Sequence, residues 1–427
     1  MRIEKYPSRD AWEKILKRPA FDVTSLFATV GSVVDKVRAE GDAALKAFEL
    51  QFDKVNLESL AVSEAEFDEA ETLVEPELKE AIVLARENVA RFHAAQKFKP
   101  IRVETCEGVV CEQRSVPIER VGLYVPGGTA PLFSTVLMLA VPAQIAGCRD
   151  IVLCTPPNRE GKVNPVILYA AHLSGVRKVF KIGGSQAIAA MAYGTESVPR
   201  VDKIFGPGNQ YVMAAKQLVS LSDVAIDMPA GPSEVEVLVD ETANAQFVAA
   251  DLLSQAEHGV DSQVVMVTTS EKMLQAVADE IEVQLNALPR KEIAEKALEH
   301  SVMILTNGMD EAIDLTNVYA PEHLVVAVKN YRAVGDRIEH AGSVFLGPYS
   351  CESAGDYASG TNHTLPTKGY ARAYSGLSLD SFMRKMTLQE LTPEGIRRIG
   401  PAVMKMASGE QLEAHCNAMR VRYEKVK

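Results

Sequence analysis

The spacing of apolar residues changes along the chain. Up to residue 97, apolar side chains recur every three or four positions, which predicts amphipathic helices over 10–16, 23–51 and 63–97. Residues 101–118 instead alternate between apolar and polar, as strands do. The start of the chain is therefore expected to be helical, followed by a short region of strands.

From residue 121 a short apolar strand, a turn rich in glycine or proline, and a helix form a unit that repeats. The predicted strands are 121–124, 151–154, 179–182 and 203–205, and the helices are 132–146, 164–173, 187–193 and 209–220. Such crossover units predict a parallel sheet with helices on both faces. The turns after the strands contain Gly127-Gly128, Pro156-Pro157, Gly183-Gly184 and Gly206-Pro207-Gly208. Four turns at the carboxyl edge of one sheet favour a nucleotide cofactor, although none matches a G-x-G-x-x-G or Walker pattern.

A second set of alternating strands and helices follows. Its strands are predicted at 235–239, 264–268, 302–306, 324–328 and 343–346, with helices at 243–258, 272–286, 290–300 and 310–317. Because the N-terminal helices need a partner, residues 23–120 are expected to pack with 235–377 as one discontinuous α/β domain. Residues 121–234 are then an inserted α/β domain, residues 1–22 a helical segment, and residues 378–427 a polar helical tail too small for a core of its own.

Composition and charge narrow the possible functions. The 427 residues are 47% hydrophobic and 24% charged, which is ordinary for two or more packed domains. A net charge of −12 without clustered Lys or Arg argues against nucleic acid or an anionic membrane and favours small molecules. The first residues lack an apolar signal segment, so a cytoplasmic protein is expected. The six cysteines show no CxxC spacing, which indicates reduced, structural thiols.

One helix end, residues 251–259, carries Gln255 and His258 one turn apart. Side chains at this spacing share a helical face, and an amide oxygen beside an imidazole can hold a divalent metal or a polar substrate. A polar helix end capped by Gly259 explains the same residues without any ligand. On these residues alone the second interpretation is favoured.

A glutamate and a histidine, Glu322 and His323, follow Pro321 directly before an apolar strand. If both lie on the loop before that strand, they can reach one site and suit proton transfer near neutral pH. An exposed pair without a function is the alternative. Residues 347–367 lack helix or strand periodicity, and long irregular segments are usually functional, so Asp356 and His363 are candidate metal or substrate ligands.

Several longer stretches carry more information together than any single motif does. They are VGLYVPGGTAPLFS (121–134), FGPGN (205–209), IDMPAGPSEV (226–235), LLSQAEHG (252–259), PEH (321–323) and SAGDYASGTNH (353–363). In this order they resemble the histidinol dehydrogenase family, over nearly the whole chain. The resemblance implies two α/β domains with Rossmann-like parallel sheets of the aldehyde-dehydrogenase type. It also implies four-electron oxidation of L-histidinol through its aldehyde to L-histidine, with two NAD reduced.

The resemblance further implies a role for each matching position. Zinc, one ion per subunit, is held by Gln255, His258, Asp356 and His415, although manganese or cobalt suits the same ligands. His323 takes the alcohol proton and Glu322 activates water to attack the aldehyde. The substrate contacts are Ser233, Gln255, His258, His323, Asp356, His363, Glu410 and His415, and the NAD contacts are Tyr124, Gln186 and Asn209.

A homodimer is also implied, in which the C-terminal tail completes the partner's site and so places Glu410 and His415 across the interface. On sequence alone the tail is only a solvated helical face. Three alternatives remain open: a related zinc and NAD dehydrogenase acting on another small polar alcohol, a zinc hydrolase in which Glu322 activates water without a dinucleotide, and, least favoured, a binding protein without catalysis.

Overall fold

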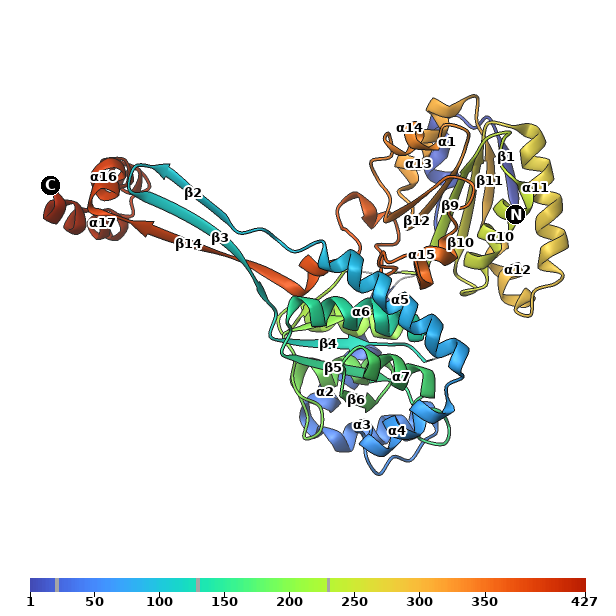
Figure 1. The fold of residues 1–427 in the computed structure, drawn as a ribbon, viewed down its shortest axis with the longest axis horizontal. Coiled ribbons are helices and arrows are strands. Elements are labelled where there is room, and N and C mark those ends of the chain that lie inside the picture. Colours follow the sequence, from blue (N-terminus) through green and yellow to red (C-terminus); the bar gives the residue numbers. More distant parts are fainter. Residues whose placement is uncertain (20–22, 128–130, 229–230) are drawn as a thin grey trace.

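The computed structural model describes residues 1–19, 23–127, 131–228 and 231–427. It contains two parallel sheets and a projecting arm (Figure 1). The predicted α/β class, with two parallel sheets, is confirmed. Some residues of the stretches that carry the resemblance lie outside the described residues, namely Gly128, Thr129, Ala130, Pro229 and Ala230.

The larger sheet has six parallel strands in the order β1-β11-β10-β9-β12-β13. They are β1 (Arg2–Lys5), β9 (Glu234–Val239), β10 (Gln263–Thr268), β11 (Val302–Leu305), β12 (His323–Ala327) and β13 (Ser343–Leu346). Its helices are α1 (Arg9–Ile15), α10 (Ala245–Ala256), α11 (Glu271–Leu285), α12 (Lys291–Glu299), α13 (Met309–Tyr319) and α14 (Tyr331–Gly335).

Helices cover both faces of this sheet. Successive strand residues point to opposite faces, so Val237 packs with α10, α11 and α12, and Leu238 packs with α1, α13 and α14. The edge strand β1 was not predicted, because its residues are mostly exposed and polar.

The smaller sheet has five parallel strands in the order β6-β5-β4-β7-β8. They are β4 (Arg120–Tyr124), β5 (Asp150–Thr155), β6 (Lys178–Lys181), β7 (Lys203–Phe205) and β8 (Ala225–Ile226). The connecting helices are α6 (Phe133–Ala146), α7 (Pro165–Leu173), α8 (Gly184–Tyr193) and α9 (Gln210–Ser220). The predicted repeat of strand, turn and helix is therefore present.

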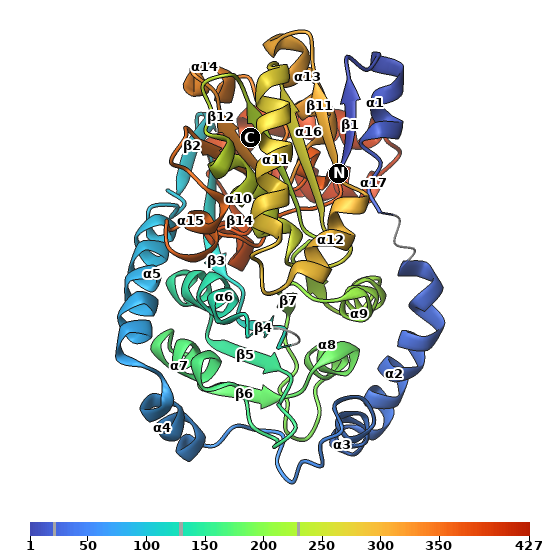
Figure 2. The same ribbon diagram turned by 90° about the vertical axis from the view of Figure 1, so that its right-hand side faces the viewer.

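The N-terminal helices pack on the smaller sheet, so the expectation that residues 23–120 pack with 235–377 is wrong. These helices are α2 (Phe27–Glu40), α3 (Asp42–Phe48), α4 (Glu64–Leu73) and α5 (Pro76–Ala94). In Figure 2, α4 and α5 lie beside α6 and α7, whereas α2 and α3 lie beside α8 and α9. The physical reason is visible in α6, which is buried on nearly all sides and needs a second layer of helices.

The arm consists of an antiparallel sheet with two helices at its tip (Figure 1). Its strands β2 (Ile101–Cys106), β3 (Val109–Pro117) and β14 (Met383–Leu391) are in the order β14-β3-β2. The helices are α16 (Pro393–Gly409) and α17 (Glu413–Val426). Strands over 101–118 are confirmed, but the tail is not wholly helical. Residues 383–391 form a strand because they find an antiparallel partner in β3, far away in the sequence.

Shorter elements complete the described chain. Residues 347–367 contain one short helix, α15 (Glu352–Tyr357), which their irregular pattern did not predict. Single turns of other helix types occur at Val23–Leu26, Glu49–Asp53, Tyr370–Arg372 and Leu379–Phe382. Within the described ranges, no helix combines the length and the apolar character needed to cross a membrane.

Candidate active site

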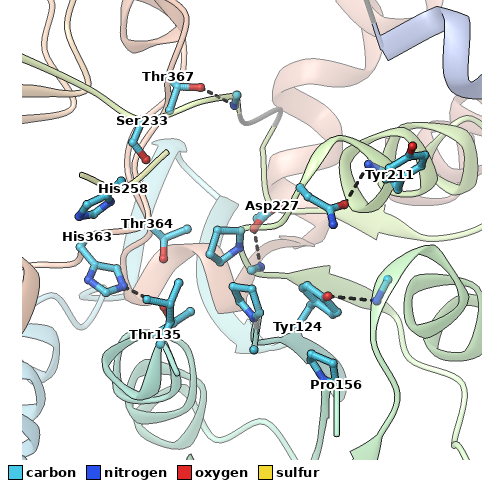
Figure 3. A pocket seen from close by; sticks show the side chains of 18 of the residues that line it. Tyr124, Thr135, Pro156, Tyr211, Asp227, Ser233, His258, His363, Thr364 and Thr367 are labelled. Carbon is cyan, nitrogen blue, oxygen red and sulfur yellow. Dashed lines mark hydrogen bonds between the residues drawn. The ribbon is translucent and has the colours of Figure 1, made fainter. Parts of the chain in front are cut away.

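A cavity of about 930 Å³ lies between the two sheets. One wall consists of turns at the carboxyl edge of the smaller sheet, after β4, β5, β6 and β7. The other wall includes residues at the amino ends of β9 and β12 in the larger sheet. Nine of the residues singled out from the sequence line this cavity: Tyr124, Gln186, Asn209, Ser233, His258, Glu322, His323, Asp356 and His363. Figure 3 shows Ser233, His258 and His363 on one side of it and Tyr124, Pro156 and Tyr211 on the other.

The end of the cavity at the smaller sheet is built from backbone turns. The Tyr124 hydroxyl accepts a hydrogen bond from the Gly184 N–H at 3.1 Å. Asn209 caps α9, and its side-chain oxygen accepts from two backbone N–H groups of that helix. Gly206 has a φ of +121°, and a Cβ there would lie 2.1 Å from the Tyr124 carbonyl oxygen. Only glycine fits this turn, where the Gly206 backbone packs directly against that of Tyr124.

Glu49 lies behind these turns, and no pattern in the sequence predicted its contact with them. It is fully buried, and its Oε1 accepts from Gln186 Nε2 at 3.0 Å and from the Gly183 N–H at 3.2 Å. Burial raises the pKa of Glu49 to about 8, although the bond from Gln186 opposes the shift. In the sequence, Glu49 lies within a predicted helix, and nothing there relates it to residues more than a hundred positions later.

A buried ion pair holds the turn after β7. Lys216 Nζ lies 2.5 Å from Asp227 Oδ1 and donates to the Gly206 carbonyl at 2.8 Å. Asp227 in turn accepts from the Gly206 N–H at 2.8 Å. Both peptide groups of Gly206 are therefore fixed by side chains, which gives the cavity a rigid rim.

At the opposite end, Glu322 and His323 lie side by side and are buried. His323 Nδ1 is 3.7 Å from Glu322 Oε2 and 3.3 Å from the Glu234 carbonyl oxygen. Glu322 Oε2 accepts from the Glu234 N–H at 2.9 Å. Burial raises the pKa of Glu322 to about 8. Burial alone would lower the pKa of His323. The surrounding carboxylates oppose this effect, with Glu352 contributing most, and raise the pKa of His323 to about 10.

Next to this pair, His258, Glu352 and Asp356 place ligand atoms within 4.8 Å of one another. Asp356 Oδ1 is 3.5 Å from His323 Nε2. Glu352 was not predicted, because its helix α15 has no periodicity that sets it apart. His258 and Asp356, nearly a hundred residues apart in sequence, are thus brought together.

Gln255 lies at the end of α10 and is fully buried. Neither of its amide atoms has a hydrogen-bond partner among the described residues, which is costly unless a ligand satisfies them. α10 packs against α15, which carries Glu352 and Asp356. The helix ends with Glu257 as its C-cap, and Gly259 does not have the left-handed conformation of a capping glycine. The prediction that Gly259 caps this helix is therefore wrong.

His363 forms the adjoining part of the wall. Its Nδ1 lies 2.9 Å from the Asp356 carbonyl oxygen, and its Nε2 lies 3.3 Å from Thr135 Oγ1 on the first turn of α6 (Figure 3). Thr135 was another residue that the sequence analysis missed. Ser233, just before β9, also lines the cavity. Imidazole, hydroxyl and carboxylate groups therefore meet at this end of the cavity.

Three predicted site residues do not line the cavity in the single chain: Gln255, which is buried at the end of α10, and two residues on the arm. Glu410 and His415 are exposed, at the end of α16 and on α17 at the tip of the arm. Figure 1 shows these helices far from the two sheets. Their predicted contribution to a partner's site remains a prediction.

Comparison with known proteins identifies the family. The family model described as histidinol dehydrogenase matches residues 16–423. The histidinol dehydrogenase of Bacteroides thetaiotaomicron is 64% identical over 427 residues, all of both chains. That of Vibrio vulnificus is 54% identical over 97% of this chain and 96% of its own. The crystal structure of histidinol dehydrogenase from Elizabethkingia anophelis, 52% identical, has a TM-score of 0.98 and covers 100% of this chain and 98% of that one. The chain therefore belongs to the histidinol dehydrogenase family.

Proposed function

We propose that this chain oxidises L-histidinol through L-histidinaldehyde to L-histidine and reduces two NAD in succession. One observation carries the proposal: the buried pair Glu322 and His323 lines the cavity next to the cluster of His258, Glu352 and Asp356. The substrate follows from the relatives, which carry the name histidinol dehydrogenase.

The donor atoms at the cluster fit a divalent metal. An imidazole nitrogen and carboxylate oxygens meet there, and Asp356 Oδ1, Glu352 Oε2 and both amide atoms of Gln255 are buried without a hydrogen-bond partner among the described residues. A mixed nitrogen and oxygen set suits zinc, and manganese or cobalt as well. We assign Gln255, His258 and Asp356 as ligands from one chain and His415 from its partner. When bound, zinc supplies a Lewis acid that holds the amino alcohol, and NAD supplies the oxidant that accepts one hydride in each step.

His323 is the base of the first step. The Glu234 carbonyl can only accept, so Nδ1 carries the proton when the ring is neutral. A divalent cation at the neighbouring cluster would offset the carboxylate charge that raises the His323 pKa and so make the neutral ring available. Nε2 then keeps its lone pair, and it has no hydrogen-bond partner among the described side chains and backbone. This nitrogen accepts the hydroxyl proton as the alcohol is oxidised.

Glu322 is the base of the second step. Its pKa, raised by burial to about 8, makes its carboxylate a stronger base than an ordinary glutamate. It takes a proton from a water molecule that attacks the aldehyde carbon. The resulting hydrate carries a hydrogen on that carbon and so has a second hydride to give, which the aldehyde itself cannot provide in this reaction.

NAD fits the other end of the cavity. The backbone turns after β4, β6 and β7 line this end, and Gly206 must be a glycine because a Cβ there would collide with the Tyr124 backbone. We propose that Tyr124, Gln186 and Asn209 contact the dinucleotide. Glu49 and the ion pair of Lys216 with Asp227 keep these turns in place.

We further propose that the active unit is a homodimer with shared sites. The arm holds α16 and α17 away from the rest of its own chain (Figure 1), and Met406 and Leu412 are 67% and 46% exposed there. Exposed apolar residues on a projecting element suit contact with a second copy.

The experiment is to follow NADH absorbance after adding histidinol and NAD to the zinc-loaded protein, with and without a chelator. Two NADH for each histidine formed, and loss of the signal on chelation, are the expected results. One NADH with release of aldehyde would contradict the two-step reaction. No NADH from histidinol, but NADH from another amino alcohol, would assign a different substrate.

A further inference from the structure

Arg18 lies after α1, in a segment that packs on the larger sheet through Trp12, Ile15 and Leu16. Its guanidinium contacts both carboxylate oxygens of Glu234, with Nη2 2.8 Å from Oε1 and Nε bonded to Oε2. Nη2 also donates to the Tyr319 carbonyl at 2.7 Å, and the guanidinium stacks on the Tyr319 ring with its carbon 4.0 Å from the ring centre. Arg18 is therefore held by a two-pronged ion pair and by stacking, the contacts that an arginine makes and a lysine does not.

Glu234 contacts both proposed bases through its backbone. Its N–H donates to Glu322 Oε2 at 2.9 Å, and its carbonyl oxygen lies 3.3 Å from His323 Nδ1. One residue therefore holds Glu322 in place and, through its carbonyl, fixes the orientation of the His323 ring, with the proton of the neutral ring on Nδ1 and Nε2 directed away from Glu234.

The Glu234 side chain is only 2% exposed, at the first position of β9. Burial of two charges costs more than burial of two apolar groups of the same volume, so packing alone does not explain this ion pair. A bidentate pair fixes the direction of both side chains, which an apolar contact does not do.

We propose that Arg18 is a positioning residue for the reaction: by holding the Glu234 carboxylate it fixes the Glu234 backbone, which orients Glu322 and His323. The proposal rests on the proposed function, in which these two residues are the bases. It adds that a residue of the N-terminal segment acts on the chemical steps without touching the substrate.

The test compares the kinetics of Arg18→Met, Arg18→Lys and Glu234→Gln with those of Arg9→Met. Arg9 is the matched control, because it lies on α1 and forms an exposed ion pair with Asp314 of α13, away from the cavity. Arg18→Met is expected to lower kcat by about tenfold or more, as small misplacements of catalytic groups do. The KM values for histidinol and NAD should stay within about twofold, and Arg18→Lys should recover part of kcat.

A double variant tests whether Arg18 acts through Glu234. Arg18→Met added to Glu234→Gln should lower kcat little further, because both changes break the same contact. Full kcat in Arg18→Met, or a loss that adds fully to that of Glu234→Gln, would overturn the proposal. If Arg18→Met does not fold, Arg18→Lys and Glu234→Gln decide: kcat equal to wild type in both overturns it. Failure of the proposed function is distinct, because the unaltered protein would then make no NADH from histidinol.

Discussion

The carboxylate of Glu352 lies 3.8 Å from Nδ1 of His323 and belongs to the same cluster as His258 and Asp356. Burial raises the pKa of Glu352 to about 8. Because this folded-state pKa is above the ordinary value of 4.5, the carboxyl group stabilises the fold least at high pH, where it is forced to ionise. The ionised form of Glu352 is stabilised in this buried position only if a cation or a protonated histidine lies next to it.

Glu352→Gln should therefore stabilise the metal-free protein at pH 8 and weaken zinc binding, by roughly tenfold or more. Thermal unfolding of the metal-free protein and competition with a chelator measure the two effects. Glu236→Gln is the matched control, because burial also raises the pKa of Glu236 to about 8, but this residue bonds to Thr316 and is outside the three-residue cluster. It should stabilise the metal-free protein without changing zinc affinity. Equal zinc affinity in both variants would show that Glu352, which is not one of the proposed ligands, does not support the metal site beside it either.

Gln255→Met tests the buried amide that has no partner. The change should raise the stability of the metal-free protein by about 1 kcal/mol, because an unsatisfied buried amide is removed. In this variant, adding zinc should no longer raise Tm, because a proposed metal ligand is absent. Gln263→Met is the control: Gln263 is also buried, but it donates to the carbonyls of Lys17 and His300 and accepts from the Tyr319 hydroxyl. That change should destabilise the protein and leave the zinc-dependent rise in place.

Glu322→Gln separates the two chemical steps. Oxidation of added histidinaldehyde should fall by about a hundredfold or more, because the base that activates water is lost. Histidinol should still give one NADH per site in a single turnover. Glu236→Gln is the control, since Glu236 is a fully buried glutamate whose pKa burial raises to about 8, but it bonds to Thr316 and does not line the cavity. Equal loss in the first and second steps would argue against separate roles for Glu322 and His323.

The sequence predicted local structure well and long-range packing poorly. The strands and helices over 121–346 follow their apolar patterns closely, and the glycine turns do line the cavity. The partner of the N-terminal helices was misassigned, because amphipathic spacing shows that a helix needs a partner but not which sheet provides it. The apolar surface around α6 was the signal that could have found that partner.

The candidate site shows the same division: local patterns pointed to some of its residues, and long-range contacts were not predicted. The pair Glu322 and His323 was singled out from its position before a strand, and most positions given by family resemblance line the cavity, apart from Gln255 and the two residues on the arm. Glu49, Glu352 and Arg18 were missed, because each acts through a residue far away in the sequence and none lies in a distinctive motif. Only the fold brings Glu49 to Gln186, or Arg18 to Glu234.

The buried carboxyl group of Glu49 should make the stability of the fold depend on pH. Its folded-state pKa of about 8 is above its ordinary value of 4.5, so its contribution is full below that ordinary value and is lost as the pH rises through 8. Glu49→Gln should therefore raise Tm relative to the unaltered protein at pH 9, with a smaller difference at each lower pH. Glu80→Gln, an exposed residue of α5, should leave the Tm profile unchanged. Parallel profiles for Glu49→Gln and the unaltered protein from pH 5 to pH 9 would contradict this prediction.

Mixed dimers test whether the tail completes the partner's site. His258→Asn and His415→Asn should each be inactive alone, because each removes a proposed metal ligand. After the two proteins are unfolded together and refolded as a mixture, half of the dimers are mixed, and one of the two sites in each has neither defect. About a quarter of the unaltered activity should then return. A mixture of Glu410→Gln with His415→Asn is the matched control, because both changes lie on the tail and every site then receives a defective tail. No recovery in the first mixture would place His415 in the site of its own chain. Recovery in the control would place Glu410 and His415 in the sites of different chains.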